Sequence, residues 1–357
     1  MRELFESTIE RLLADLATPE YVGGCEGGKW PAELWAAVEE SGFALAAAPE
    51  ALGGAEAAWG DLYCVSRALG RHAAPLPLGE AMLGNWLLGR AGLEPRYGVL
   101  SIAANGHLSL RDGRVGGRLV DVPWGRHAQK LVALGENPDG TLNVVLLAKA
   151  DARDCSESLN IAGEPRDCLD FANAAVVAQA PLPEGLDGNV LLLGGAMLRA
   201  AQMSGALQAL LDMTVGYANE RKQFGRAIGA FQAIQQQLAM FAEQVAAASI
   251  AAEAAFAESD SELASLSIAA AKVCAGEAAS AGAGIGHSVH GAIGFTHEYP
   301  LHLLSRRLWA WRSEFGSASS WSRQIGGTVC ATRAEGYWPL LTTPASQLMN
   351  PEEGAWA

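Results

Sequence analysis

Hydrophobic residues recur at helical spacing in the second half of the chain. Between positions 231 and 245 they follow one another at alternating steps of three and four residues, which places them on one face of an α-helix. These residues are Phe231, Ile234, Leu238, Phe241 and Val245. A second, Ala-rich helix is predicted from about Glu262 to Gly282, because alanine favours helix formation and lets helices approach closely. The pattern predicts an antiparallel bundle of long helices over residues 187–343.

The middle of the chain has a different pattern. From residue 97 to about 182, short apolar runs such as GRLVDVP and LNVVLLAK alternate with turn signals such as RDG and NPDG. Runs of strand length at regular intervals are typical of a small antiparallel sandwich or barrel. The first part of the chain instead has helical stretches separated by Gly and Pro. We therefore predict an α+β fold: an N-terminal helical domain (1–94), a middle antiparallel β-domain (95–186), the helical bundle and a loose tail (344–357).

Charge and cysteine content exclude several classes of function. The chain has 25 Lys and Arg against 39 Asp and Glu, a net charge of −14, which disfavours nucleic acid and anionic membranes as partners. Its six cysteines lie far apart without a C-x-x-C pair, which argues against a zinc site and a disulfide framework. The N-terminus carries acidic residues, unlike a signal peptide, and the most apolar stretch is too short to span a bilayer. We expect a soluble, cytoplasmic protein.

Three segments resemble the acyl-CoA dehydrogenase family. The run YANERKQFGRAIGAFQ (217–232) is similar to the family signature Y-x-x-x-R-x-x-F-G-x-x-I-x-x-F/H-Q. PEALGG (49–54) is similar to part of the family's N-terminal domain, and HGAIGFTHEYPLHLLSRRLWAW (290–311) to its G-G-x-G-(F/Y)-x-x-E-x-P block. The segments stand in the family's order over about residues 20–335. The resemblance implies FAD as cofactor, acyl-CoA as substrate, an electron-transferring flavoprotein as electron acceptor, and a homo- or hetero-oligomer (dimer or tetramer).

The resemblance also implies which residues contact the flavin of a neighbouring subunit. Arg221 and Gln223 would approach its pyrophosphate, Phe224 would lie against the cofactor, and Gln232 would lie near the adenine end. An arginine suits this role because its planar, permanently charged fork matches phosphate oxygens. The alternatives are a surface arginine before a helix-ending glycine, and an amide of Gln232 that bonds a helix N-terminus.

Other flavin contacts are implied by a second glycine motif and by the β-domain. Gly291 and Ala292 would let the backbone approach phosphate or ribose oxygens. Two departures are visible, since Ser288 stands where the family usually has Gln and Ala292 replaces the second glycine. Trp124 would cover the flavin ring, unless it is a core aromatic residue. The family's T-E-P-x-x-G-S-D loop is absent from the start of the β-domain.

The resemblance implies that a carboxylate removes a proton from the acyl α-carbon while a hydride leaves the β-carbon. Most family members carry this base in a Y-E-G-T segment, to which EFGS (314–317) corresponds here. Phe315 occupies the usual base position, so the carboxylate is displaced by one residue. The stretch that carries the base in a minority of relatives has no acid here. Glu314 is the candidate base, and the alternative is that it pairs with Arg312 or is solvated.

Two arginines and a group of histidines complete the candidates. Arg306 and Arg307 follow EYP at the family's spacing and would contact the phosphates of coenzyme A, unless they form salt bridges with Glu298 or Glu314. The histidines between positions 287 and 302 lack the spacing of a ligand set, so no metal site is expected. No G-x-G-x-x-G follows a strand, so a Rossmann site is not supported.

Two functions remain open at this stage. The first is FAD-dependent conversion of an acyl-CoA thioester into a 2-enoyl-CoA, with Glu314 as base and electrons passed to an electron-transferring flavoprotein. The second is a non-catalytic or half-site partner subunit, as in relatives that resemble steroid side-chain enzymes and assemble from unlike chains. The short chain, the missing loop and Phe315 favour the second.

Overall fold

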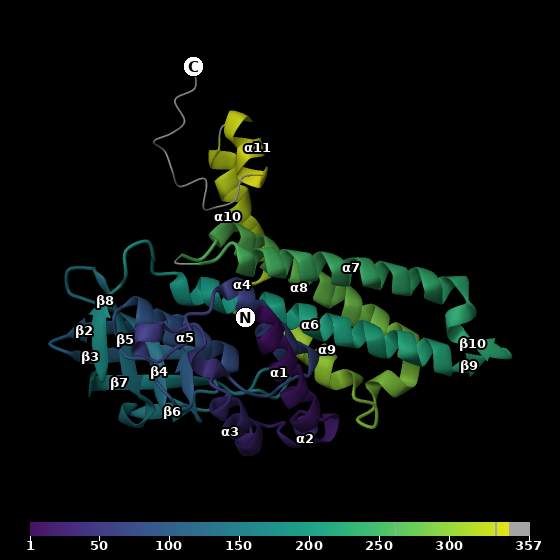
Figure 1. The fold of residues 1–357 in the computed structure, drawn as a ribbon, viewed down its shortest axis with the longest axis horizontal. Helices are drawn as coiled ribbons and strands as arrows, with labels where there is room; N and C mark the ends of the chain where they lie inside the picture. The colour runs from purple at the N-terminus through teal and green to yellow at the C-terminus, as the bar shows by residue number, and fades with distance from the viewer. Residues whose placement is uncertain (261, 333, 343–357) are drawn as a thin grey trace.

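The computed structural model describes residues 1–342 apart from 261 and 333, so the predicted tail 344–357 lies outside the described residues. The chain runs from short helices through a sheet to long helices, as the hydrophobic pattern predicted (Figure 1). The N-terminal helices are α1 (Arg2–Leu16), α2 (Pro19–Gly24), α3 (Ala32–Glu40), α4 (Trp59–Arg71) and α5 (Leu78–Arg90). The C-terminal helices are α6 (Val190–Glu220), α7 (Gln232–Ala257), α8 (Ser265–His290), α9 (Leu301–Trp311), α10 (Ala318–Ala331) and α11 (Ala334–Thr342).

Between the two helical parts lies one eight-stranded sheet, in the order β6-β7-β3-β2-β4-β5-β8 with β1 beside β4. The strands are β1 (Leu100–Ile102), β2 (Asn105–Arg111), β3 (Arg114–Pro123), β4 (Lys130–Glu136), β5 (Leu142–Ala148), β6 (Asp154–Ser156), β7 (Arg166–Ala175) and β8 (Ala178–Pro181). The sheet is mixed rather than purely antiparallel. β1 and β2 follow one another along one edge of β4, so both pair with it in parallel.

The sheet is buried on both faces where it meets the helices. Along β4, Leu131 and Ala133 belong to a core inside the β-domain, whereas Val132 between them packs into the larger core shared with the helices. Side chains of a strand alternate between its faces, so a strand covered on both sides needs a continuous apolar run. This explains why the runs KLVALG and LNVVLLAK are apolar throughout.

The long helices α6, α7 and α8 pack against one another, and α4 packs across α6. At this crossing, glycines let the two backbones touch: a Cβ on Gly70 of α4 would overlap the backbone of Gln202, and one on Gly205 of α6 would overlap the backbone of Arg67. Close crossings of this kind require small residues at the contact. The N-terminal domain is thereby fixed on the bundle next to the first half of α6.

Two helices, α6 and α7, are long and apolar enough to cross a membrane by length and composition alone. In α6, 94% of the qualifying window is buried inside the molecule, as in the core helix of a soluble protein. In α7, the buried share is 28%, so this helix exposes an apolar surface along one side of the bundle. Figure 1 shows α7 along the upper edge of the bundle, with nothing from the described chain above most of its length.

Candidate functional site

The corner between α9 and α10 holds the candidate base. Helix α9 ends at Trp311, and the chain then turns through Phe315 (φ 51°) and Gly316 (φ 94°), both in the left-handed region. Such a turn reverses the chain within a few residues and lets adjacent side chains point to different sides. The indole Nε1 of Trp321 donates to the carbonyl of Phe315 at 3.0 Å and helps to hold the corner.

The carboxylate of Glu314 is held by two guanidinium groups. Arg166 of β7 donates from Nε (2.9 Å) and Nη2 (2.9 Å), and Arg199 of α6 donates from Nε (2.8 Å). Asn160 Nδ2 adds a fourth hydrogen bond at 2.8 Å. Burial alone would raise the pKa of Glu314, but Arg166 and Arg199 hold it well below its usual range. The side chain pairs with Arg166 and Arg199 rather than with Arg312, and it is 15% exposed, so it is not the solvated surface group of the other alternative.

The two arginines belong to a larger buried cluster. Arg199 Nη2 donates to Glu80 of α5 at 2.6 Å, and Arg166 Nη2 donates to Glu164 at 2.9 Å. Arg307 of α9 pairs with Glu164 through Nε at 3.1 Å. The cluster contains three arginines and three glutamates, Arg166, Arg199, Arg307, Glu80, Glu164 and Glu314, so its charges cancel. It joins the N-terminal domain, the β-domain and the bundle at one point.

Phe315 turns in the opposite direction from Glu314 and packs on α6. A Cβ at Gly195 would overlap its ring, so only glycine fits at this position of the helix. The guanidinium carbon of Arg199 lies 5.2 Å from the centre of the same ring, within the range of a cation–π contact. The ring is 8% exposed. The position where relatives would carry a base is thus filled by a buried aromatic ring.

A cavity of about 310 Å³ opens between this corner and the β-domain. The corner contributes Ser313, Glu314 and Phe315, and the opposite wall contains Asn105, Asp121 and Ser158. The strands β2 and β3 therefore form one side of the space and the end of α9 the other. A ligand in this cavity would meet both polar and apolar side chains, with the Glu314 carboxylate in the wall.

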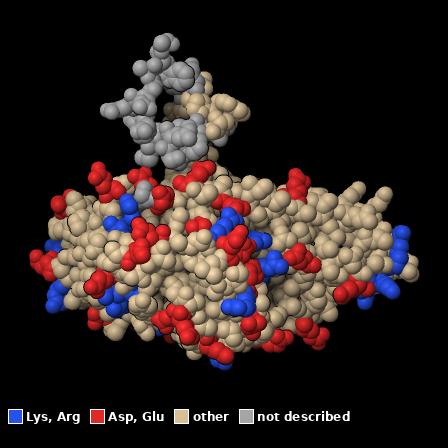
Figure 2. All heavy atoms as spheres, viewed as in Figure 1, with Lys and Arg blue, Asp and Glu red and all other residues tan. Residues whose placement is uncertain are grey.

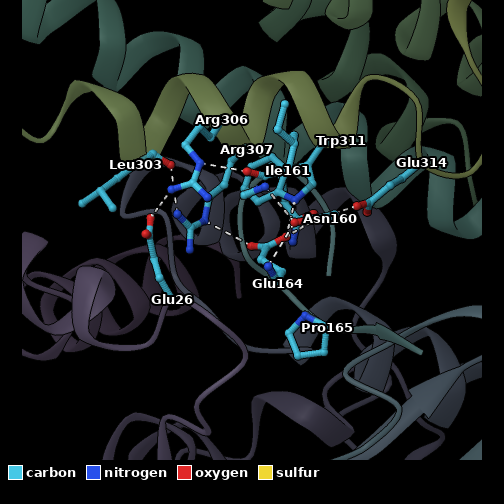
Figure 3. A network of polar contacts seen from close by, with 12 residues as sticks. Glu26, Asn160, Ile161, Glu164, Pro165, Leu303, Arg306, Arg307, Trp311 and Glu314 are labelled. Atoms are coloured by element: carbon cyan, nitrogen blue, oxygen red, sulfur yellow. Dashed lines mark hydrogen bonds and ion pairs between the residues drawn. The ribbon is translucent and has the colours of Figure 1, made fainter. Parts of the chain in front are cut away.

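Arg306 and Arg307 both make contacts inside the chain (Figure 3). Arg306 pairs with Glu26 at 2.8 Å and donates through Nε to the carbonyl of Ile161 at 2.8 Å. Arg307 is buried, pairs with Glu164 and donates through Nη1 to the carbonyl of Leu303 at 2.9 Å. Both form salt bridges, as the alternative expected, but with Glu26 and Glu164 rather than with Glu298 or Glu314. Arg307 is enclosed among these contacts, whereas the side chain of Arg306 is 33% exposed.

Trp124 lies at the end of β3 in an aromatic cluster. Its ring is 5.8 Å from the ring of Trp30 and 5.9 Å from that of His127, and the residue is 3% exposed. His127 Nε2 in turn lies 2.7 Å from the carbonyl oxygen of Gly28. Trp124 therefore packs between the β-domain and the N-terminal helices, which is the arrangement that the core alternative describes.

The signature segment forms a hairpin at the far end of the bundle. Strands β9 (Lys222–Gln223) and β10 (Arg226–Ala227) project beyond α6 and α7, at the right of Figure 1. Phe224 at its tip has φ 51° and is 93% exposed, and Arg221 and Gln223 are exposed as well. Among the described residues, Arg221 takes part in no ion pair. Figure 2 shows Lys and Arg gathered at this end of the molecule.

The second glycine motif lies at the same end. The ring of His290, the last residue of α8, stacks on Tyr217 near the end of α6 with centroids 4.5 Å apart. Gly291 (φ 64°) and Ala292 follow directly and are exposed. Gln232 is the first residue of α7, and its exposed amide makes no side-chain hydrogen bond within the described part of the chain. All flavin contacts that the two motifs imply are therefore brought together here.

The hairpin and the Glu314 corner are far apart within one chain. Arg199, which holds Glu314, and Arg221, which leads into the hairpin, are 22 residues apart along α6 and its end. At about 1.5 Å per residue this is a separation of ~33 Å. A ligand at the hairpin of one chain can reach a corner such as that of Glu314 only if the corner belongs to another chain.

Four members of the buried cluster, Glu80, Glu164, Arg166 and Arg199, and the neighbouring Lys272 were not predicted from the sequence. Lys272 of α8 is 0% exposed and its Nζ donates to three backbone carbonyls around the corner. A signal for such residues was present, because Arg199 stands alone in the apolar run LLLGGAMLRAAQM and Lys272 alone in IAAAKVCAG. A charge inside a helix that is apolar on all sides must be buried, and a buried charge needs partners.

Comparisons with known proteins agree with the motifs. Residues 190–325 match the family model for the acyl-CoA dehydrogenase C-terminal domain. The acyl-CoA dehydrogenase IpdE2 of Mycolicibacterium smegmatis is 30% identical over 312 residues, which cover 86% of this chain and 91% of that protein. Among solved structures, the ChsE4-ChsE5 complex from Mycobacterium tuberculosis contains a chain with a TM-score of 0.83 and 25% identity, covering 93% of this chain and 98% of that one. A glutaryl-coenzyme A dehydrogenase in complex with glutaryl-CoA has the same fold, with a TM-score of 0.80, 22% identity and coverage of 93% and 95%. The chain described here belongs to the acyl-CoA dehydrogenase family.

Proposed function

We propose that this chain is one subunit of an FAD-dependent acyl-CoA dehydrogenase in which a partner chain carries the catalytic base. The observation that carries the proposal is the arginine clamp on Glu314. A carboxylate whose pKa is held far below its usual range is a weak proton acceptor. Protonation of Glu314 would also leave the guanidiniums of Arg166 and Arg199 buried without their counter-charge, which is costly.

No other described side chain of the cavity is suited to replace it. Phe315 occupies the position where relatives would carry the base, and it has no group that accepts a proton. Asp121, the other carboxylate of the cavity wall, is exposed to solvent on β3. A base that removes a proton from carbon works best in a site from which water is excluded. The cavity of this chain therefore supports a half-site better than a complete one.

The hairpin supports a role in holding FAD. Arg221 presents a guanidinium that no described carboxylate neutralises, and Phe224 presents an exposed ring beside it. These groups suit a pyrophosphate and a flat apolar surface, and Gly291 leaves space for close approach at the same end. FAD bound there would supply the acceptor for the hydride that leaves the acyl β-carbon. Because the hairpin is ~33 Å along the bundle from its own corner, we infer that it serves a flavin seated largely on the partner.

The surface of the bundle supports assembly with a second chain. Helix α7 exposes Met240 (60%) and Ile250 (70%) among alanines. Apolar side chains in this arrangement are commonly covered in an oligomer. Two proteins with the same fold carry the names of two components. They are the ChsE4-ChsE5 complex and the Tcur3481-Tcur3483 steroid acyl-CoA dehydrogenase. We propose that this chain likewise assembles with a second, unlike chain. The resulting cytoplasmic hetero-oligomer would act on acyl-CoA and pass electrons to an electron-transferring flavoprotein.

The colour of the purified chain tests this proposal. Expressed alone, the chain is expected to be colourless or weakly yellow, and to retain stoichiometric flavin only when co-purified with an acyl-CoA dehydrogenase chain that carries the Y-E-G-T base. Addition of acyl-CoA under anaerobic conditions should bleach the flavin of the assembly. A chain that alone retains flavin and is bleached by acyl-CoA would contradict the half-site proposal and restore Glu314 as the candidate base.

A further inference from the structure

Lys272 is a buried cation that the proposed function does not use. It lies in α8 with 0% of its surface exposed. Among the described residues no carboxylate lies within ion-pair distance of its amine. Its Nζ instead donates to the carbonyl oxygens of Trp311 (3.0 Å), Arg312 (2.9 Å) and Gly316 (2.9 Å). A protonated amine has three donors, and all three find an acceptor here.

The three acceptors surround the corner between α9 and α10. Trp311 and Arg312 end α9, where carbonyl groups have no partner within the helix and the helix dipole is negative. Gly316 lies at the other side of the turn. The amine thus joins the two ends of the corner across the core of the bundle, from a helix that is itself fixed by its packing on α6 and α7.

The backbone that this amine holds has an unfavourable conformation. Phe315 is a non-glycine residue at φ 51°, and such residues persist only where the surroundings fix them. Two groups contribute: the indole of Trp321, which bonds the carbonyl of Phe315, and the amine of Lys272. These two groups fix the backbone of the turn from which Glu314 is directed at Arg166 and Arg199 and Phe315 at α6.

We propose that Lys272 is a positioning residue of the cavity, whose ammonium group fixes residues 311–317 and thereby sets the orientation of both Glu314 and Phe315. The proposal concerns the shape of the cavity wall and does not depend on whether FAD binds or which chain supplies the base. It predicts that loss of the three hydrogen bonds loosens the corner locally while α7 and the hairpin stay as they are.

Hydrogen exchange measured by mass spectrometry at about pH 6, where Lys272 keeps its proton because its pKa is lowered only to about 7, tests the proposal on the full chain. Lys272→Met keeps the aliphatic stem but removes the donors, and Glu277→Gln on the exposed side of α8 is the matched control. Amides of residues 311–317 should exchange about tenfold faster or more in Lys272→Met, as expected when hydrogen bonds from a charged donor are lost. Peptides from α7 should be unchanged in both variants. Equal exchange of the corner in Lys272→Met and in the wild type would overturn the proposal.

Rescue by small molecules distinguishes the effect of the charge of the Lys272 side chain from the effect of its volume. In Lys272→Ala, added ethylammonium ion should restore protection of the corner, whereas ethanol of similar size should not. Restoration by both compounds would show that filling the space suffices and would overturn the proposal.

If neither Lys272 variant folds, hydrogen exchange of the wild-type chain tests the proposal. The amides of Arg312 and Ser313, which bond Leu308 and Ala310, should then exchange as slowly as those of α8 around Lys272. Faster exchange of the corner than of α8 by orders of magnitude would overturn the proposal.

Discussion

Glu314 and Lys272 carry opposite charges on two sides of the same corner; Lys272 is fully buried, and the side chain of Glu314 is 15% exposed. The carboxylate has two guanidinium partners, whereas the amine has only carbonyl dipoles. Burial therefore dominates at Lys272 and lowers its pKa to about 7, with Arg199 lowering it further and Glu314 opposing. The pKa values of the two residues are lowered for different reasons, because only Glu314 has a full counter-charge within hydrogen-bond distance.

The lowered pKa of Lys272 predicts a pH dependence of stability. In the unfolded chain this amine keeps its proton up to about pH 10.4, so between pH 7 and 10 the unfolded state binds more protons and stability rises with pH. The contribution is roughly 1.4 kcal/mol per pH unit in that window. Urea unfolding of the wild type and of Lys272→Met at pH 7.5 and 9 (roughly the middle of the window) should show the rise in the wild type only. Parallel shifts in both proteins would contradict the assigned direction.

Arg199 should be far more important for stability than Arg306. Arg199→Met leaves Glu80 and Glu314 buried without a shared cation, and removing one partner of a buried pair costs about 3–5 kcal/mol. Arg306→Met breaks a partly exposed pair with Glu26, worth about 1 kcal/mol or less. Thermal melts of both variants check this, and similar losses would mean that the cluster contributes no more than a surface pair.

At the scale of elements, the contact between α6 and the corner depends on a glycine, Gly195, which has no side chain to overlap the corner. A Cβ at Gly195 would overlap the ring of Phe315, so Gly195→Ala should destabilise the chain by about 1–3 kcal/mol despite the better helix propensity of alanine. Phe315→Leu, combined with it, should recover part of the loss because the smaller side chain can shift. Gly216 of α6 has open space around it and serves as control. Additive effects of Gly195→Ala and Phe315→Leu would contradict the contact.

Helices and strands could be predicted where one periodicity covers a whole element. The three-and-four spacing over 231–245 begins at the N-cap of α7 and continues inside this helix, and the apolar runs of the middle domain match β4 and β5. The parallel pairing of β1 with β4 could not be predicted, because it depends on where the chain returns after β3. The buried cluster of arginines and glutamates could not be predicted either. Glu80, Glu164 and Glu314 come from three parts of the chain, and only folding brings them to Arg166 and Arg199.

At the scale of the whole molecule, the flavin contacts implied by the two glycine-containing motifs lie at one end of the bundle and the corner lies toward the other. This arrangement predicts that Arg221→Ala affects cofactor binding and not folding. In an assembly with a partner chain, the variant should lose about ten- to a hundredfold in FAD affinity, the size of a lost charge-assisted contact. The melting of the chain alone should stay as in the wild type, since Arg221 is exposed at the hairpin.

Lys222→Ala is the matched control for this prediction. Lys222 is the exposed neighbour of Arg221 and has the same sign of charge, but the family motif implies no cofactor contact for it. Equal loss of FAD in both variants would indicate a general effect of positive charge at this end. No loss in either would separate the hairpin from the flavin site.

The most direct test of the central claim is anaerobic bleaching of bound flavin by acyl-CoA in an assembly that contains Glu314→Gln. If the base belongs to the partner, the variant assembly should bleach at a rate close to that of the wild type, once melting and flavin content show that it is folded and loaded. Removal of the partner's Glu should abolish bleaching. A folded, flavin-loaded Glu314→Gln assembly that no longer bleaches would contradict the account, because Glu314 would then have to leave its arginines and take the proton itself.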